Sequence, residues 1–233
     1  DRIQDPKILQ DIKDFTRQEA QHSMVHTLYN DRLKSQGIDI DGILKGQEKR
    51  LFGIIRKQTS RQFSLDMTAA SEHITAIMAD CFVERPEIFD GADERIRALY
   101  VWHAMEEMEH KSVAFDVLRD YAKGSYSNRV RSMLLVTCLF PFHTFRIMAH
   151  MLKVDGFSPL QRAKIWAKGL WWLYKPGGVF LPMTAKYFSY LKPGFHPWQD
   201  PVVPSYEPWL RFLQESGDPI EAGNRLHQSH MHA

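Results

Sequence analysis

The sequence predicts an all-α fold, and three observations lead to this prediction. Apolar residues recur at three- and four-residue spacing through several long stretches. Helix-capping residues stand where these stretches begin, as in Asp5-Pro6 and Ser158-Pro159-Leu160-Gln161. Almost no stretch alternates apolar and polar residues as a half-buried strand does. The 233 residues suffice for one domain with an extension.

Composition excludes several classes of function. The formal net charge of +2 gives no electrostatic reason to expect binding to nucleic acid. Cys81 and Cys138 are the only cysteines and lie far apart, which excludes a disulfide framework and a thiolate zinc site. No signal peptide is visible, so we expect a cytoplasmic protein.

The first helix is expected over residues 6–35, beginning after the N-cap residue Asp5. Its inward stripe is apolar except at the middle, where Glu19, His22 and His26 replace apolar residues. Glu19 and His22 form a Glu-x-x-His pair, which is the spacing that carboxylate-bridged helical bundles use for metal ligands.

The second long helix is expected over about residues 61–83, after a shorter basic helical stretch at 39–57. Glu72 lies in its middle, with Ala69 and Ala76 about one turn away on either side. These small neighbours leave room for a bound group close to the backbone, so Glu72 is a candidate ligand.

The third long helix is expected to follow the loop at 90–93 and to end near Gly124. Its residues His103, Glu107 and His110 stand at i, i+4 and i+7 and therefore project from one face. The same face continues in apolar residues on both sides: Ile96, Leu99, Ala114, Val117 and Tyr121. Burying an unpaired carboxylate or imidazole costs several kcal/mol. A bound cation is the simplest group that would satisfy them.

Six residues are therefore predicted metal ligands: Glu19, His22, Glu72, His103, Glu107 and His110. Carboxylate and imidazole ligands without thiolate suit iron, manganese or zinc. Two metal ions, most simply iron, would use this many ligands. A four-helix plan needs one more lone Glu. Glu48 is a candidate, but it sits in a charged face. Because the chain opens on Asp1 without Met, we expect the missing Glu to lie upstream of Asp1.

Other polar residues near the stripe have roles that the sequence leaves open. These residues either bind metal or orient a ligand: His26, His73, Glu106 and Asp116. Lys111 is expected to be an ordinary surface residue. No catalytic group beyond the metal centre is evident.

The chain changes character after Gly124. Residues 1–124 are predicted to form the metal-binding bundle, 125–200 aromatic-rich helices packed on it, and 201–233 a wrap with a flexible tail bearing histidines. Pro141 is expected to interrupt the apolar stretch at 133–145, and Arg146 follows directly, so the stretch is expected to be too short to span a membrane.

The aromatic residues of 125–200 allow three interpretations. They form plain core, they line a channel for a hydrophobic substrate, or they lie against a membrane surface. In the last case Lys164, Lys168 and Lys175 would reach the headgroups, and the protein would be peripheral at the membrane.

The stretches Phe15–His22, Glu72–Ala76 and Trp102–Val117, together with Lys192–Trp198, resemble a bacterial family of predicted metal-dependent hydrolases. This resemblance covers nearly the whole chain and implies a ferritin-like bundle with a di-metal carboxylate core. Members of this family usually begin with an added segment that carries a Glu. Separately, the His-x-x-x-Glu-x-x-His pattern of His103, Glu107 and His110 resembles di-iron N-oxygenases of the para-aminobenzoate N-oxygenase type.

The leading functional interpretation is a non-haem di-iron enzyme that uses O2 to oxidise a hydrophobic or amine-bearing small molecule. No flavin or nicotinamide fingerprint is present, so electrons would come from a partner reductase or from the substrate. The alternative is a metal-dependent hydrolase that uses a metal-bridging hydroxide on an ester or phosphoester. A non-catalytic metal-binding protein is the third class. A homodimer is compatible with each.

Overall fold

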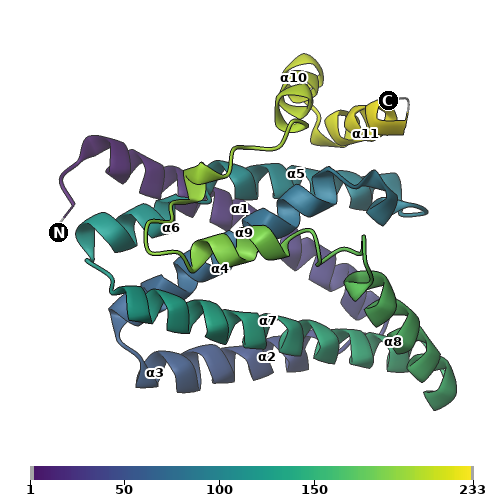
Figure 1. Cartoon of the computed structure of the whole chain (residues 1–233). Coiled ribbons are helices and arrows are strands. Elements are labelled where there is room, and N and C mark those ends of the chain that lie inside the picture. The colour runs from purple at the N-terminus through teal and green to yellow at the C-terminus, as the bar shows by residue number, and fades with distance from the viewer. Residues whose placement is uncertain (1–2, 232–233) are drawn as a thin grey trace. The chain divides into compact units, whose positions relative to one another are not determined.

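The computed structural model describes residues 3–231, and within this range the chain is helical and has no strand, which confirms the all-α prediction. Figure 1 shows the order of the helices. The long helices are α1 (Pro6–Ser35), α4 (Arg61–Val83), α5 (Glu94–His110) and α7 (Tyr126–Val154). The shorter ones are α2 (Ile40–Arg50), α3 (Arg56–Gln58), α6 (Val113–Asp116), α8 (Pro159–Tyr174), α9 (Thr184–Tyr190), α10 (Tyr206–Ser216) and α11 (Pro219–Met231).

The chain divides into two compact units. Unit 1 comprises Asp1–Ser71 and Val113–Leu181, and unit 2 comprises Glu72–Ser112 and Pro182–Ala233. The boundaries fall inside α4 and just after α5. They differ from the boundaries predicted at residues 124 and 200, because contacts between distant segments, and not changes in composition, define the units.

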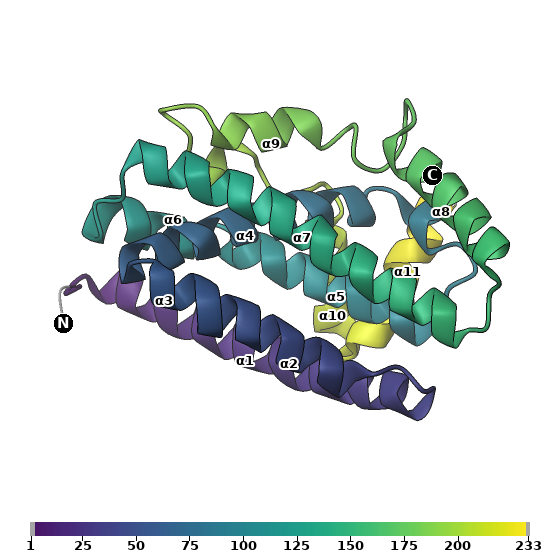
Figure 2. The ribbon, with the colours of Figure 1, turned by 90° about the horizontal axis from the view of Figure 1, so that it is seen from below.

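Local sequence accounts for both ends of α1 in unit 1. The Asp5 carboxylate accepts hydrogen bonds from the backbone N–H groups of Lys7 and Ile8, which satisfies donors that have no partner inside the helix. The helix ends at Ser35, and Gly37 follows with φ +88°, a conformation that favours glycine. α2 runs alongside α1, as Figure 2 shows.

α7 in unit 1 corrects the expectation that Pro141 interrupts the helix. It is continuous from Tyr126 to Val154 and contains this proline. A proline inside a helix removes one backbone hydrogen bond but does not require the helix to end. α7 is the one described helix that is long and apolar enough to cross a membrane by length and composition. Only 17% of its apolar stretch is buried inside the protein.

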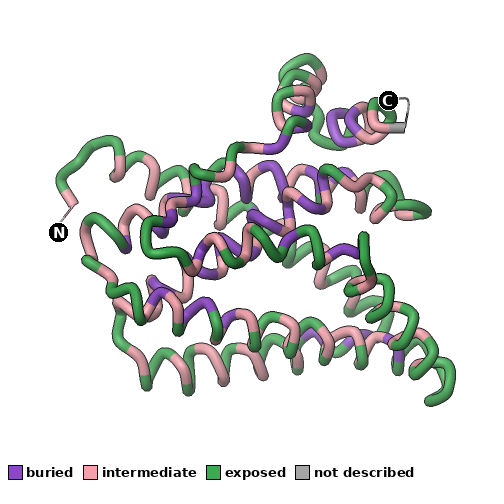
Figure 3. The backbone as a smooth tube through the Cα atoms, viewed as in Figure 1, coloured by how far each residue is buried: buried purple, intermediate pink, exposed green. Residues whose placement is uncertain are grey.

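Helix α5 is the centre of unit 2. It packs against α11, and α11 in turn packs against α10. The core between them contains Met105 and Met108 from α5, Trp209 from α10, and Ala222 and Leu226 from α11. Figure 3 shows buried residues following α5 along its length.

α10 and α11 correct the predicted flexible tail. Asp218 ends the turn between them by accepting a hydrogen bond from the Ile220 N–H (2.8 Å). His230 lies within α11 and its Nε2 is 2.9 Å from the Ser205 hydroxyl oxygen. His227 is also helical, whereas His232 lies outside the described residues. The apolar face of α11 is hard to predict from its sequence because polar residues flank Ala222 and Leu226.

Gly223 sets how closely α11 approaches α5. A Cβ at this position would lie 2.9 Å from the Ala98 Cα, and a backbone atom cannot move aside cheaply. We expect Gly223→Ala to lower the free energy of unfolding by about 1–3 kcal/mol, as overpacking does. Gly169 of α8 is a matched control, because nothing lies within 4 Å of its added Cβ. Gly169→Ala should raise stability by up to about 1 kcal/mol; urea denaturation measures both, and equal effects would contradict the close approach.

Asp66 of α4 makes stability depend on pH. It is fully buried, and neither carboxylate oxygen accepts a hydrogen bond from the described residues. Burial raises its pKa to about 6, although Arg129 opposes this shift. The folded state therefore holds the proton more tightly than the unfolded state, so stability is lost as pH rises through this pKa.

We expect Asp66→Asn, which cannot ionise, to gain stability relative to the wild type as pH rises from about 4 to 7, by at most about 3 kcal/mol. Urea denaturation across this pH range tests the prediction. A difference between the two proteins that does not change with pH would contradict it.

Candidate metal centre

Two helices of unit 2 bring four predicted metal ligands together. α5 carries His103, Glu107 and His110, and α4 carries Glu72. Glu107, His110 and Glu72 are buried, with 7%, 3% and 9% of their surface exposed. The structure thus places charged and polar side chains in the interior of unit 2, where each needs a compensating partner.

Glu107 is held through both carboxylate oxygens. Its Oε1 lies 2.9 Å from His103 Nε2, and its Oε2 accepts a hydrogen bond from the Thr75 hydroxyl at 2.6 Å. Burial acts to raise the pKa of Glu107, but the hydrogen bonds from His103 and Thr75 outweigh it and lower the pKa. The group is therefore a carboxylate at neutral pH, as metal ligation requires.

Glu72 and His110 form the second pair in unit 2. His110 Nδ1 lies 3.2 Å from Glu72 Oε2. A carboxylate beside one imidazole nitrogen fixes the orientation of the ring and raises its basicity. Glu72 therefore either binds metal itself or orients His110.

In unit 1, α1 holds Glu19 and His22 next to each other. His22 Nδ1 lies 3.6 Å from Glu19 Oε1. His22 is the one buried residue of α1, at 3% exposure, whereas the Glu19 side chain is 42% exposed. An apolar side chain would be easier to bury at position 22, so a histidine there indicates that its imidazole has a polar partner to bind.

The remaining candidates have other surroundings. His26 is exposed on α1, and Glu106 is half-buried. Asp116 pairs with Arg119 at 3.0 Å. The exposure of His26 differs from the inward position predicted for it, although it lies one turn from the buried His22.

His73 packs against aromatic residues. Its ring stacks on Tyr190 and meets Phe195 edge-on, at centroid distances of 4.9 and 5.1 Å. Its Nε2 lies 3.1 Å from the Lys186 carbonyl oxygen. Burial lowers the pKa of His73 to about 4, so the ring is neutral at pH 7. These contacts give His73 a packing role in unit 2.

Lys111 corrects the expectation of an ordinary surface residue. It is only 5% exposed, its ammonium group donates to the Asp200 carbonyl at 2.5 Å, and it lies over the Trp198 ring. Burial lowers its pKa. Asp200 and Trp198 are distant from Lys111 in sequence, so no local pattern could predict its burial.

The role of Thr75 could not be predicted for a different reason, since a lone threonine in a helix carries no signal.

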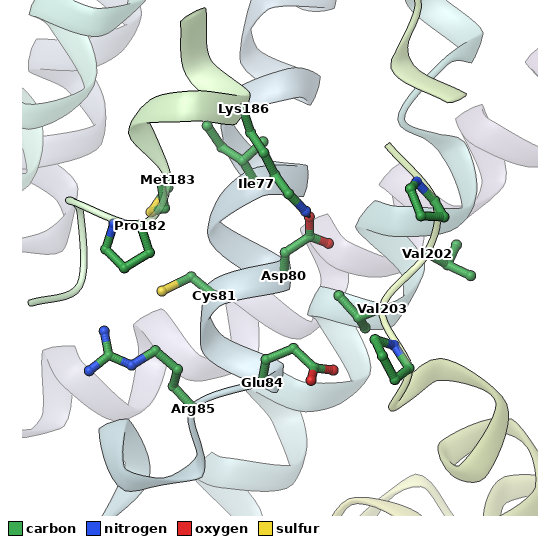
Figure 4. Close-up of a pocket in the computed structure, with 12 residues that line it drawn as sticks. Ile77, Asp80, Cys81, Glu84, Arg85, Pro182, Met183, Lys186, Val202 and Val203 are labelled. Carbon is green, nitrogen blue, oxygen red and sulfur yellow. The ribbon is translucent and has the colours of Figure 1, made fainter. Parts of the chain in front are cut away.

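A cavity of about 330 Å³ lies further along α4 in unit 2. Figure 4 shows Asp80 and Cys81 on one wall and Lys186 reaching across to Asp80. The Lys186 ammonium nitrogen lies 2.5 Å from an Asp80 carboxylate oxygen. Val202 and Val203 line the opposite side. The charged groups that line the cavity already have polar partners, so the surface that remains for a ligand to contact is mainly apolar.

The donor set of unit 2 fits a metal ion of borderline character. It offers carboxylate oxygens and imidazole nitrogens without thiolate, which suits iron, manganese or zinc. The chain matches the family described as predicted metal-dependent hydrolases over residues 1–200. The chain belongs to this family.

Membership in the predicted metal-dependent hydrolases confirms the resemblance read from the sequence. The matched range includes α1, α4 and α5, the helices that carry all six predicted ligands. It implies a metal-dependent enzyme and favours hydrolysis, which the sequence offered as the alternative to O2 activation. No curated protein and no solved structure matches the chain.

Thr75 provides a test of the site that does not depend on activity. We expect Thr75→Val to weaken metal binding about 10- to 100-fold without unfolding the chain, because Glu107 loses a partner that orients it. Thr68→Val is the control: the Thr68 hydroxyl bonds the Ser64 carbonyl within the same helix at 3.2 Å. Competition with a chromophoric chelator measures affinity. Equal affinity in both variants would show that Thr75 does not support a ligand.

Proposed function

We propose that this chain is a metal-dependent hydrolase whose metal ligands are Glu72, His103, Glu107 and His110 of unit 2 and Glu19 and His22 of α1. Membership in the family of predicted metal-dependent hydrolases is the observation that carries the reaction class. Glu19 and His22 of α1, like Glu107 and His110 of α5, carry the carboxylate and imidazole donors that a metal ion of this kind needs.

The number of ligands favours two ions over one. Each of the two Glu-x-x-His pairs offers one carboxylate and one imidazole, and the usual carboxylate-bridged set is completed by a lone Glu from each of two further helices. Glu72 and His103 add one oxygen and one nitrogen. Six protein ligands leave open positions on two ions, which a substrate needs in order to bind.

When bound, a metal pair of this kind lowers the pKa of coordinated water and polarises an ester or phosphoryl oxygen. The chain's own residues hold the ligands ready. Thr75 and His103 fix the Glu107 carboxylate, and Glu72 fixes the His110 ring. Met105 and Met108 on the same helix are fully buried and contribute to a dry interior.

Oxidation by a di-iron centre is the second candidate, and the ligand spacing favours it. Paired Glu-x-x-His motifs on separate helices are used by di-iron carboxylate proteins. The extra nitrogen of His103 extends the likeness to N-oxygenases. This function would require O2, a hydrophobic or amine-bearing small molecule, and electrons from a reductase or from the substrate.

Metal analysis of the anaerobically purified chain separates the two candidates. Zinc or manganese, with hydrolysis of ester or phosphoester substrates and no reaction with O2, is the result expected for the hydrolase. About two irons per chain, with O2 consumption by the reduced protein, would instead support oxidation by a di-iron centre and contradict the hydrolase proposal. A chain that binds none of these metals would overturn both.

Glu107→Ala tests the ligand assignment in the same experiment. We expect it to lose at least one metal per chain while remaining helical, because the burial of α5 against α10 and α11 does not depend on Glu107. Glu109→Ala is the control on the same helix, since Glu109 is exposed and accepts a hydrogen bond from Tyr206. Full metal content in the Glu107 variant would remove Glu107 from the site.

A further inference from the structure

Helices α7 and α8 of unit 1 expose large apolar side chains. None of the residues of α8 is buried. Leu160 and Trp171 of this helix are 67% and 66% exposed. The exposed group also includes Leu134, Phe140, Phe142 and Trp172. Aromatic residues in these numbers at the surface mark a place where another surface docks.

The two helices act as one surface. The Phe145 ring of α7 meets the Trp166 ring of α8 edge-on at 5.3 Å, and the helices are in contact. These inner aromatic residues hold α8 in place. The exposed Leu160 and Trp171 stand on another side of α8.

Charge is strongly one-sided in this part of the chain. Residues 126–181 contain eight Lys and Arg against one acidic residue, Asp155. This gives the segment a net charge of +7 in a chain whose total is +2, so the other residues together carry −5. A basic and aromatic surface complements a partner surface that combines negative charges with an apolar layer beneath them.

We propose that the outer face of α7 and α8 binds the surface of an anionic lipid bilayer. Leu160, Lys164, Lys168 and Trp171 stand at i, i+4, i+8 and i+11 and therefore share one side of α8. Leu160 and Trp171 enter the boundary between headgroups and acyl chains, where Trp is favoured. Lys164 and Lys168, both exposed, extend their ammonium groups to the phosphates.

The charge pattern of α7 favours lying at the surface over crossing the bilayer. The uncharged run between Arg131 and Arg146 has 14 residues. A helical run of this length spans about 21 Å, whereas the hydrocarbon core is about 30 Å thick. The proposal does not depend on the metal centre or on the reaction that it supports.

Vesicle flotation of the full chain tests the proposal. We expect the chain to float with phosphatidylcholine vesicles that contain about one third phosphatidylglycerol, and binding to fall at least tenfold on pure phosphatidylcholine or in 0.5 M salt. Lys164→Glu/Lys168→Glu should reduce binding at least tenfold. Lys45→Glu/Lys49→Glu on α2 is the matched control, because both lysines are exposed at the same i, i+4 spacing.

Leu160→Ser tests the apolar part, with Leu28→Ser as its control because both leucines are 67% exposed. Only the Leu160 variant should lose binding, and circular dichroism confirms that each variant is folded. Four results would overturn the proposal. The first two are no flotation with anionic vesicles at low salt, and equal losses in test and control variants. The third is a chain that carbonate cannot extract from the vesicles, which indicates a spanning helix. The fourth is a concentration-dependent dimer that Leu160→Ser abolishes, which would assign the face to a second copy.

Discussion

The burial of carboxylates beside imidazoles is the constraint on which unit 2 depends. Glu72 and Glu107 lie in the interior, where an uncompensated charge costs several kcal/mol. His110, His103 and Thr75 supply part of the compensation at hydrogen-bond distance. This arrangement requires α4 and α5 to keep a fixed register, since a shift of one residue rotates each side chain by about 100°. A metal ion would complete the compensation and would lock the same register.

Residues near the carboxyl end of the chain hold these helices from outside. Lys186 pairs with Asp80 of α4, and the Lys186 carbonyl oxygen meets His73. Lys111, directly after His110, bonds the Asp200 carbonyl. Two of these contacts fix residues next to predicted ligands, since His73 follows Glu72 and Lys111 follows His110. The segment 182–204 therefore serves as a brace for the site, which explains why a metal-binding core needs so much chain beyond its own helices.

The two parts of the chain differ in what their polar residues do. In unit 2, charges are buried and paired, so they order side chains for chemistry. Over residues 126–181 of unit 1, which include α7 and α8, basic residues outnumber acidic residues by eight to one, and large aromatic rings are exposed. Paired buried charges thus mark the candidate site for a metal ion, whereas an excess of basic residues marks the surface suited to an anionic bilayer. The overall charge of +2 conceals this division completely.

The sequence by itself determined the helices that have strong local signals: α1 from Asp5-Pro6, α8 from its Ser158 capping box, and α4 and α5 from their periodicity. It also determined the Glu and His spacing, because positions i, i+3, i+4 and i+7 share a helix face whatever surrounds it. Tertiary structure alone decided that Lys111 is buried, that Thr75 holds Glu107, that α7 continues through Pro141 and that α11 docks through Gly223. The physical reason is that burial and hydrogen bonding between distant segments depend on packing, which no short stretch of sequence contains.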